Sequence, residues 1–363
     1  MAGLSLPVNL ADSVRREFWR ISAKTSLGRH CIHDRHTRLM ILAIASMSVA
    51  LAITAVAPLW MLLLAPILLG APHIVGDIRY LLVRPPIALR RWFVALLLIP
   101  LLAQTALRVS VMFDMPRHAL AEVSFGVAAV MLGVVAAPGR LWRRLVTGAA
   151  VAAIGSAALY WPRESGLALA HLHNFIAVGI WLLFAVRAGG GFKAALASLF
   201  FLACCLAIMA GVLDGITASF AGWAAPVWGF EAEGWTMALA PGLPDAMALR
   251  VVQTYIFAQA MHYTVWLRLM PQELHETAPP TTFVQDLKSL RSDFGVTGLL
   301  LIVVGVLAVP AYAFVDFSGA WPALSLENAS MANWGYLTIV LFHGWLELAF
   351  LSYFSVSGAR PAP

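Results

Sequence analysis

The chain has 363 residues, of which 61% are apolar and only 12% are charged, and its mean hydropathy is +0.83. This composition excludes a soluble globular domain and indicates a polytopic membrane protein. The net charge of +6 does not indicate nucleic-acid binding, because the basic residues lie between apolar runs rather than on one polar face.

The first 38 residues form a basic arm with seven Lys and Arg residues and no apolar run long enough for a signal peptide. Anionic lipid attracts such a segment, so we expect a cytoplasmic arm on the inner membrane face. A transmembrane domain at 39–355 and a short tail at 356–363 follow. The 3 cysteines form no disulfide framework and no haem-attachment motif.

Ten apolar runs approach the length of about 20 residues that a membrane-spanning helix needs. Their cores lie at 39–56, 59–78, 92–110, 119–137, 145–161, 167–186, 194–213, 246–267, 294–315 and 333–354.

With the N-terminus inside, only Arg108, Arg117, Arg163 and Arg250 of the 24 Lys and Arg residues fall on the outer side. This asymmetry is typical of inner-membrane proteins. The sequence therefore predicts an all-α, polytopic bundle of about ten transmembrane helices, in the inner membrane, with both termini cytoplasmic.

The long outer loop at about 214–245 contains no Lys or Arg. Its aromatic residues Trp223, Trp228, Phe230 and Trp235 are most simply interpreted as anchors at the membrane surface. A re-entrant lid over a cavity is the alternative interpretation.

Ionisable side chains inside apolar segments give the main functional signal, because they are costly at membrane depth. His73 and Asp77 lie one helical turn apart on the second run, and His343 and Glu347 repeat that spacing on the last. Each carboxylate can accept a proton from a ring nitrogen or bind a metal beside it.

Two further runs also carry histidine. His171 and His173 point to nearly opposite sides of a helix, so we favour His173, which lies deeper and precedes Asn174. His262 follows Gln259 by one turn and Tyr255 by two, so this helix face resembles the wall of an internal site.

A common site for these histidines requires tilted or broken helices. On the predicted spans, His173 lies about 10 Å below the outer surface, whereas His73 and His262 lie in the inner half. Pro72 and Pro162 permit such breaks. The alternative is that each histidine only packs or hydrogen-bonds between helices.

Three or four neutral imidazoles with few anionic ligands suit iron, copper or zinc better than magnesium or calcium. A site within hydrocarbon favours an apolar substrate that arrives from the lipid. Non-haem iron that activates O2 is the metal we favour for such chemistry.

The Pro72-His73-x-x-x-Asp77 motif, followed by single histidines on later helices, resembles the Brp/Blh family of membrane-integral carotene dioxygenases. That family holds a non-haem iron with histidines from several helices. The resemblance implies that His73, His173, His262 and His343 are iron ligands and that Asp77 is a supporting acid.

Our leading hypothesis is a metal-dependent oxygenase that acts on a lipid-like or isoprenoid molecule. Asp77, Glu347 and Tyr255 are its candidate catalytic residues, with the two carboxylates orienting the ligands. Gln259 and Asn174 line the cofactor and substrate side, and His171 is kept as a further candidate ligand. The alternatives are a haem-binding electron-transfer protein with two axial histidines, and a transporter or accessory subunit with proton-relay histidines.

Overall fold

The computed structural model describes residues 2–85, 89–227, 230–275, 282–316, 318 and 322–358, with the side chains of 2–8 and of residue 339 left aside. The chain is 83% helical, which confirms the all-α prediction. The helices are α1 (Ala2–Ser22), α2 (Ser26–His33), α3 (Arg35–Val56), α4 (Pro58–Asp77), α5 (Arg91–Val111), α6 (Ala119–Ala136), α7 (Leu141–Tyr160), α8 (Pro162–Arg187), α9 (Gly191–Met209), α10 (Asp214–Ser219), α11 (Ala232–Leu239), α12 (Asp245–Thr264), α13 (Met270–Glu273), α14 (Phe283–Phe314) and α15 (Ala329–Ser357).

Four short elements complete the secondary structure of the described residues. Two π-helical segments, η1 (Ile78–Val83) and η2 (Val265–Leu269), continue α4 and α12 without a break. An antiparallel pair of two-residue strands, β1 (Val315–Asp316) and β2 (Ala323–Leu324), joins α14 to α15.

Among the described residues, 8 helices are long and apolar enough to cross a membrane, as expected of a multi-pass membrane protein. They are α3, α4 with η1, α5, α6, α8, α9, α14 and α15. The predicted spans 145–161 and 246–267 fall on α7 and α12, which are both 20-residue helices but are not among the 8.

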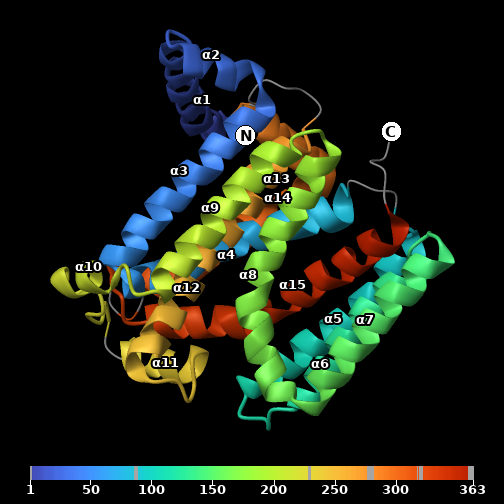
Figure 1. The fold of residues 1–363 in the computed structure, drawn as a ribbon. Helices are drawn as coiled ribbons and strands as arrows, with labels where there is room; N and C mark the ends of the chain where they lie inside the picture. The colour runs from blue at the N-terminus through green and yellow to red at the C-terminus, as the bar shows by residue number, and fades with distance from the viewer. Residues whose placement is uncertain are drawn as a thin grey trace.

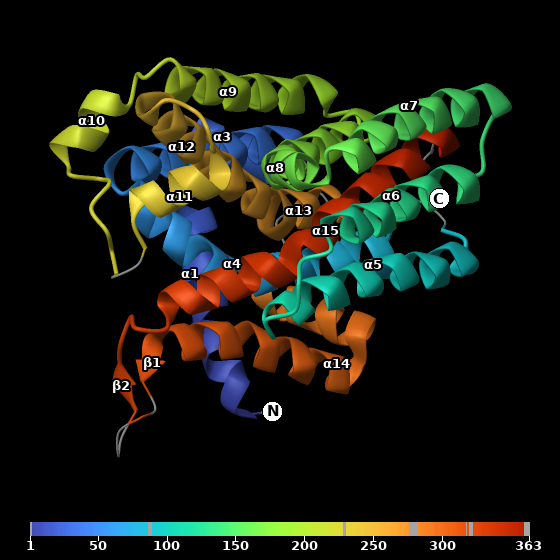
Figure 2. The same ribbon diagram turned by 90° about the horizontal axis from the view of Figure 1, so that it is seen from below.

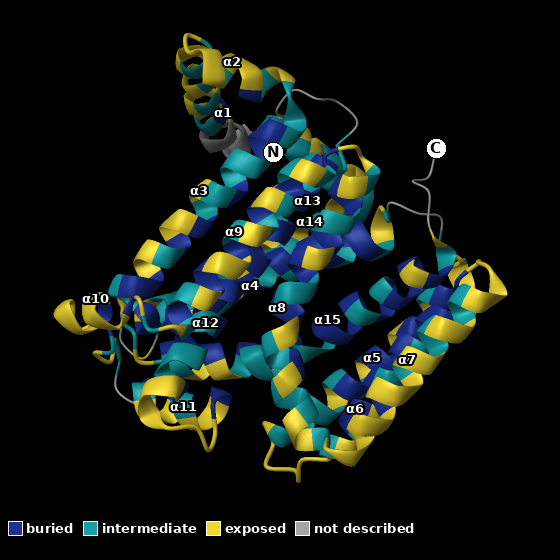
Figure 3. Ribbon diagram, viewed as in Figure 1, coloured by how far each residue is buried: buried dark blue, intermediate teal, exposed yellow. Residues whose placement is uncertain are grey.

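Helix α15 crosses the molecule obliquely and lies between two groups of helices (Figure 1). The hairpin of α5 and α6, with α7, packs on one side of it, and α4 and α8 pack on the other. The view from below shows α14 beneath this arrangement (Figure 2). Buried residues follow α15, whereas exposed residues follow the outer side of α7 (Figure 3). The middle of α15 is therefore the centre of the fold.

Small residues on α6 allow α15 to approach closely. A methyl group added at Gly133 would lie 2.3 Å from the Ala349 carbonyl oxygen, and one at Gly126 would lie 2.2 Å from the Trp345 ring. Glycine at such a contact lets two membrane helices pack with their backbones close together. Ser352 of α15 also donates a hydrogen bond to the Val130 carbonyl of α6 at 2.8 Å. These contacts fix the position of α15.

A buried ion pair joins η1, which continues α4, to α14. Arg79 Nε lies 2.7 Å from Asp293 Oδ2, and its Nη2 donates to Ser289 Oγ at 2.5 Å. Arg84 bonds to the other oxygen of Asp293. Asp293 is almost fully buried, so the pair is structural rather than a solvated surface contact.

The Asp293→Asn variant is expected to be destabilised by about 3 kcal/mol, because it leaves the buried Arg79 without its counter-charge. Thermal unfolding of the detergent-purified protein measures the change. Glu327→Gln, at an exposed position, is the matched control and should unfold like the parent protein. An Asp293→Asn curve that superimposes on the control curve would show that the pair contributes no stability.

The outer loop folds back on the bundle. Phe230 is fully buried, and Trp235 is 2% exposed and stacks on Trp334 with ring centroids 4.4 Å apart. The interpretation of these two residues as surface anchors was therefore wrong, because both bury their rings against other apolar side chains. Trp228 lies outside the described residues. Helix α11 instead closes one side of an internal cavity.

Candidate metal centre

Three buried histidines and one buried carboxylate from three helices converge on one point. They are His73 and Asp77 of α4, His262 of α12 and His343 of α15, and one candidate ligand atom from each lies within 4.8 Å of all the others. Each side chain is buried. Such a group can hold a metal ion.

A fourth histidine borders this group from α8. The His173 ring centroid lies 4.9 Å from that of His262 and 5.0 Å from that of His343. The oblique path of α15 brings His343 to the other rings (Figure 1), and π-helical segments begin directly after Asp77 and three residues after His262. Such π-turns often occur at functional sites.

Backbone carbonyls orient three of the histidines. Nδ1 of His73 bonds to the Leu69 carbonyl at 3.2 Å, Nδ1 of His173 bonds to the Leu169 carbonyl at 3.0 Å, and Nδ1 of His343 bonds to the Val340 carbonyl. A carbonyl oxygen can only accept, so each Nδ1 carries the proton and each Nε2 carries a free lone pair.

The ligand-side atoms lack partners within the protein. Nε2 of His73, Nε2 of His343 and both ring nitrogens of His262 are buried without a hydrogen bond among the described residues, as are both carboxylate oxygens of Asp77. Each such atom would cost free energy in an apolar interior if nothing bound it. A metal ion in the middle of the cluster would bind Nε2 of His73, Nε2 of His343, one ring nitrogen of His262 and an Asp77 oxygen together.

The sequence suggested that Asp77 and Glu347 orient the histidines one turn before them. In the structure, backbone carbonyls bond to those histidines instead. Helical side chains lean toward the N-terminus, so Nδ1 of His73 and of His343 meets a carbonyl of the preceding turn. Asp77 instead faces the cluster. Glu347 accepts a hydrogen bond from Trp266 Nε1 at 2.7 Å, and its Oε1 lies 3.8 Å from His262 Nε2.

The spacing of the cluster fits one ion after a small closure. Four ligands in a tetrahedral arrangement with bonds of about 2.1 Å lie about 3.4 Å apart. Ligand atoms that lie within 4.8 Å of one another must therefore each move inward by at most about 0.8 Å to hold one ion. Imidazole nitrogens with one carboxylate oxygen suit iron, copper and zinc.

The other predicted site residues divide between the cavity and its surroundings. Tyr255 and Gln259 line the cavity, and Gln259 Nε2 donates to the Tyr255 hydroxyl at 3.3 Å. His171 lies outside the cluster, because its Nε2 bonds to the Leu239 carbonyl at 2.8 Å. Asn174 is buried and donates to the Ala170 carbonyl at 3.3 Å, and it does not line the cavity.

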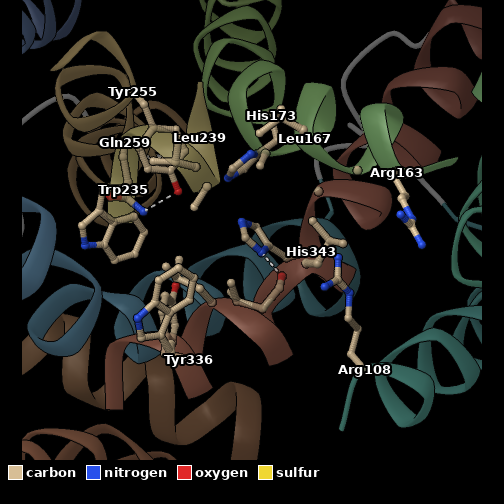
Figure 4. Close-up of a pocket in the computed structure, with 18 of the residues that line it drawn as sticks. Arg108, Arg163, Leu167, His173, Trp235, Leu239, Tyr255, Gln259, Tyr336 and His343 are labelled. Atoms are coloured by element: carbon tan, nitrogen blue, oxygen red, sulfur yellow. Dashed lines mark hydrogen bonds between the residues drawn. The ribbon is translucent and has the colours of Figure 1, made fainter. Parts of the chain in front are cut away.

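A cavity of about 380 Å³ opens onto the cluster. His73, His173 and His343 lie in its wall together with apolar side chains that include Leu337 and Val340. Figure 4 shows His173 and His343 facing each other across the space, with Trp235 and Tyr255 on one side. The cavity can therefore present a bound molecule directly to the candidate metal ligands.

Sequence reasoning missed two tyrosines beside the cluster. The Tyr263 ring centroid lies 4.6 Å from that of His73, and the Tyr336 hydroxyl lies 3.4 Å from His73 Nδ1. Two patterns could have indicated them. Tyr263 directly follows His262, and Tyr336 precedes His343 by two helical turns on the same face.

No protein-family model matches the chain, and no curated protein or solved structure matches it.

Proposed function

We propose that the chain is a membrane-integral, non-haem metalloenzyme, and more specifically an iron-dependent oxygenase that acts on a lipid-like or isoprenoid molecule. The observation that carries the proposal is the convergence of partnerless histidine nitrogens and Asp77 oxygens in a buried cluster beside a cavity. The resemblance of the Pro72-His73-x-x-x-Asp77 motif to carotene dioxygenases supports the same reaction class.

In this proposal the chain's own residues hold the ion and exclude water. His73, His262, His343 and Asp77 bind the metal, with His173 as a further ligand on the cavity side. Bound iron would supply the activation of O2. Tyr263, Tyr336 and Gln259 provide hydrogen-bonding groups beside the substrate, and the apolar wall excludes bulk water.

The geometry favours this proposal over a haem protein. The His73 ring lies edge-to-face with the rings of both His262 and His343 at centroid distances of 5.1 Å. Such close packing around one point suits a single ion better than a wide, flat macrocycle.

We also propose that α7 and α12 complete a set of ten spans, with both termini on the cytoplasmic side of the inner membrane. The distribution of Lys and Arg between alternate loops supports this topology. In it, the cavity opens toward the outer side, where Arg108, Arg117 and Arg163 lie.

Elemental analysis of the detergent-purified protein, run together with its visible spectrum, tests the proposal. We expect about one iron per chain and no haem absorption band. A haem band would favour the electron-transfer alternative. A preparation without transition metal, even after incubation with ferrous iron under reducing conditions, would overturn the metalloenzyme assignment.

A further inference from the structure

Charged residues line one side of the cavity. Arg108 of α5, Arg117 of the α5–α6 loop and Arg163 of α8 all line this region, together with Glu164. Figure 4 shows the Arg108 and Arg163 side chains on the same side of the cavity. These are three of the four arginines that the sequence places on the outer side.

The arginines are only partly neutralised. Arg108 Nε lies 2.8 Å from Glu122 Oε2, and Arg117 Nε lies 3.6 Å from Glu122 Oε1, so this buried carboxylate is shared between two guanidinium groups. Arg163 is exposed and makes no hydrogen bond or ion pair with any residue that the structure describes. Three guanidinium groups thus face two carboxylates, and a net positive charge remains.

The start of α6 adds a second feature that favours an anion. Arg117, Arg163 and residues 118–121 border an adjoining depression of about 680 Å³. His118, the N-cap of α6, makes no side-chain capping bond, so the first N–H groups of this 18-residue helix have no cap partner. A helix N-terminus of this kind attracts negative charge.

We infer that the substrate is an amphiphilic anion, whose carboxylate or phosphate headgroup binds Arg163 and Arg117 while its apolar tail enters the cavity toward the histidines. This inference rests on the proposed function and narrows its substrate class. A fully apolar molecule would gain nothing from the arginines, whereas an anionic headgroup would bind them with charge-assisted hydrogen bonds.

The fold also sets a distance between headgroup and reactive carbon. Arg163 and His173 both lie on α8, ten residues apart, which corresponds to about 15 Å along the helix. The headgroup would therefore be held about that far from the metal ligands. The carbon that reacts lies well inside the tail, not next to the headgroup.

Competition binding to the full-length protein in a neutral detergent tests this inference. Radiolabelled palmitate is displaced by unlabelled palmitate, hexadecyl phosphate or hexadecanol, which share one chain length and differ in headgroup. We expect the two anions to bind at least about tenfold more tightly than the alcohol, as a charge-assisted hydrogen bond provides. The better anion identifies the headgroup as carboxylate or phosphate.

Arg163→Gln should reduce palmitate affinity about tenfold and leave hexadecanol affinity unchanged. Arg250→Gln is the matched control, because Arg250 is the remaining outer-side arginine, binds Asp214 at 2.6 Å and does not line the cavity. Equal binding of palmitate and hexadecanol, or an Arg163→Gln protein that binds palmitate like the control, would overturn the inference.

Metal content is measured on the same samples, so that the two proposals are tested separately. Protein that holds iron but shows no preference for anions retains the proposed function and loses this substrate class. Protein that prefers anions but holds no metal loses the proposed function, and the headgroup site then stands as a lipid-binding site alone.

Discussion

Purified His343→Ala protein is expected to lose its metal ion while remaining inserted and folded. His343 lies at the centre of the cluster, and its ring contacts those of His73, His173 and His262. Loss of a residue that only hydrogen-bonds to a metal ligand lowers metal affinity about 10–100-fold. Loss of a ligand itself should therefore lower it by at least about 100-fold. Metal content per chain after purification measures the effect.

His171→Ala provides the control for this experiment. His171 is a partly buried histidine only two residues from His173, but its Nε2 bonds to a backbone carbonyl rather than facing the cluster. Its replacement should leave metal content unchanged. Equal metal content in the His343→Ala and His171→Ala proteins would show that the cluster does not bind the ion.

Gly133→Ala is expected to destabilise the protein by about 3 kcal/mol, the upper end of the range for overpacked cores. The added methyl group would lie 2.3 Å from both the Ala349 carbonyl oxygen and Ser352 Oγ, so α15 must move away from α6. Because α15 carries His343 and Glu347, metal affinity should fall as well. Thermal unfolding and metal content are measured together.

The matched control is Gly179→Ala on α8. At this position nothing lies within 4 Å of an added methyl group, and alanine favours the helix over glycine. The control should therefore be at least as stable as the parent protein. If Gly133→Ala unfolds at the same temperature as Gly179→Ala, the close contact between α6 and α15 does not hold the centre of the fold.

The sequence was informative about the site because ionisable side chains stand out within apolar helices. That ground alone was enough to choose His73, Asp77, His262 and His343. Their convergence could not be predicted, because the distances between helices depend on how α15 crosses the bundle. Asn174 was chosen for being next to His173, but it does not line the cavity and donates to the Ala170 carbonyl instead.

Fold prediction succeeded for the apolar segments and was weakest where polar contacts or breaks decide the structure. The predicted span 294–315 begins at the kink of α14, where Gly295 has a positive φ of 69°, but the helical segment before it was not foreseen. The burial of Trp235 was also missed, because a tryptophan in an outer loop is equally suited to a membrane surface and to a stack against Trp334.

The two π-helical segments make the ligand positions depend on residue count. A π-turn amounts to one residue inserted into an α-helix, so the segments before and after it face directions that one continuous α-helix would not allow. Deletion of one residue within 78–83 would rotate α4, which carries His73 and Asp77, by about 100° relative to the chain that follows η1. A change in the length of α4 or α12 near these segments would therefore misplace His73, Asp77 or His262 even if every side chain were kept.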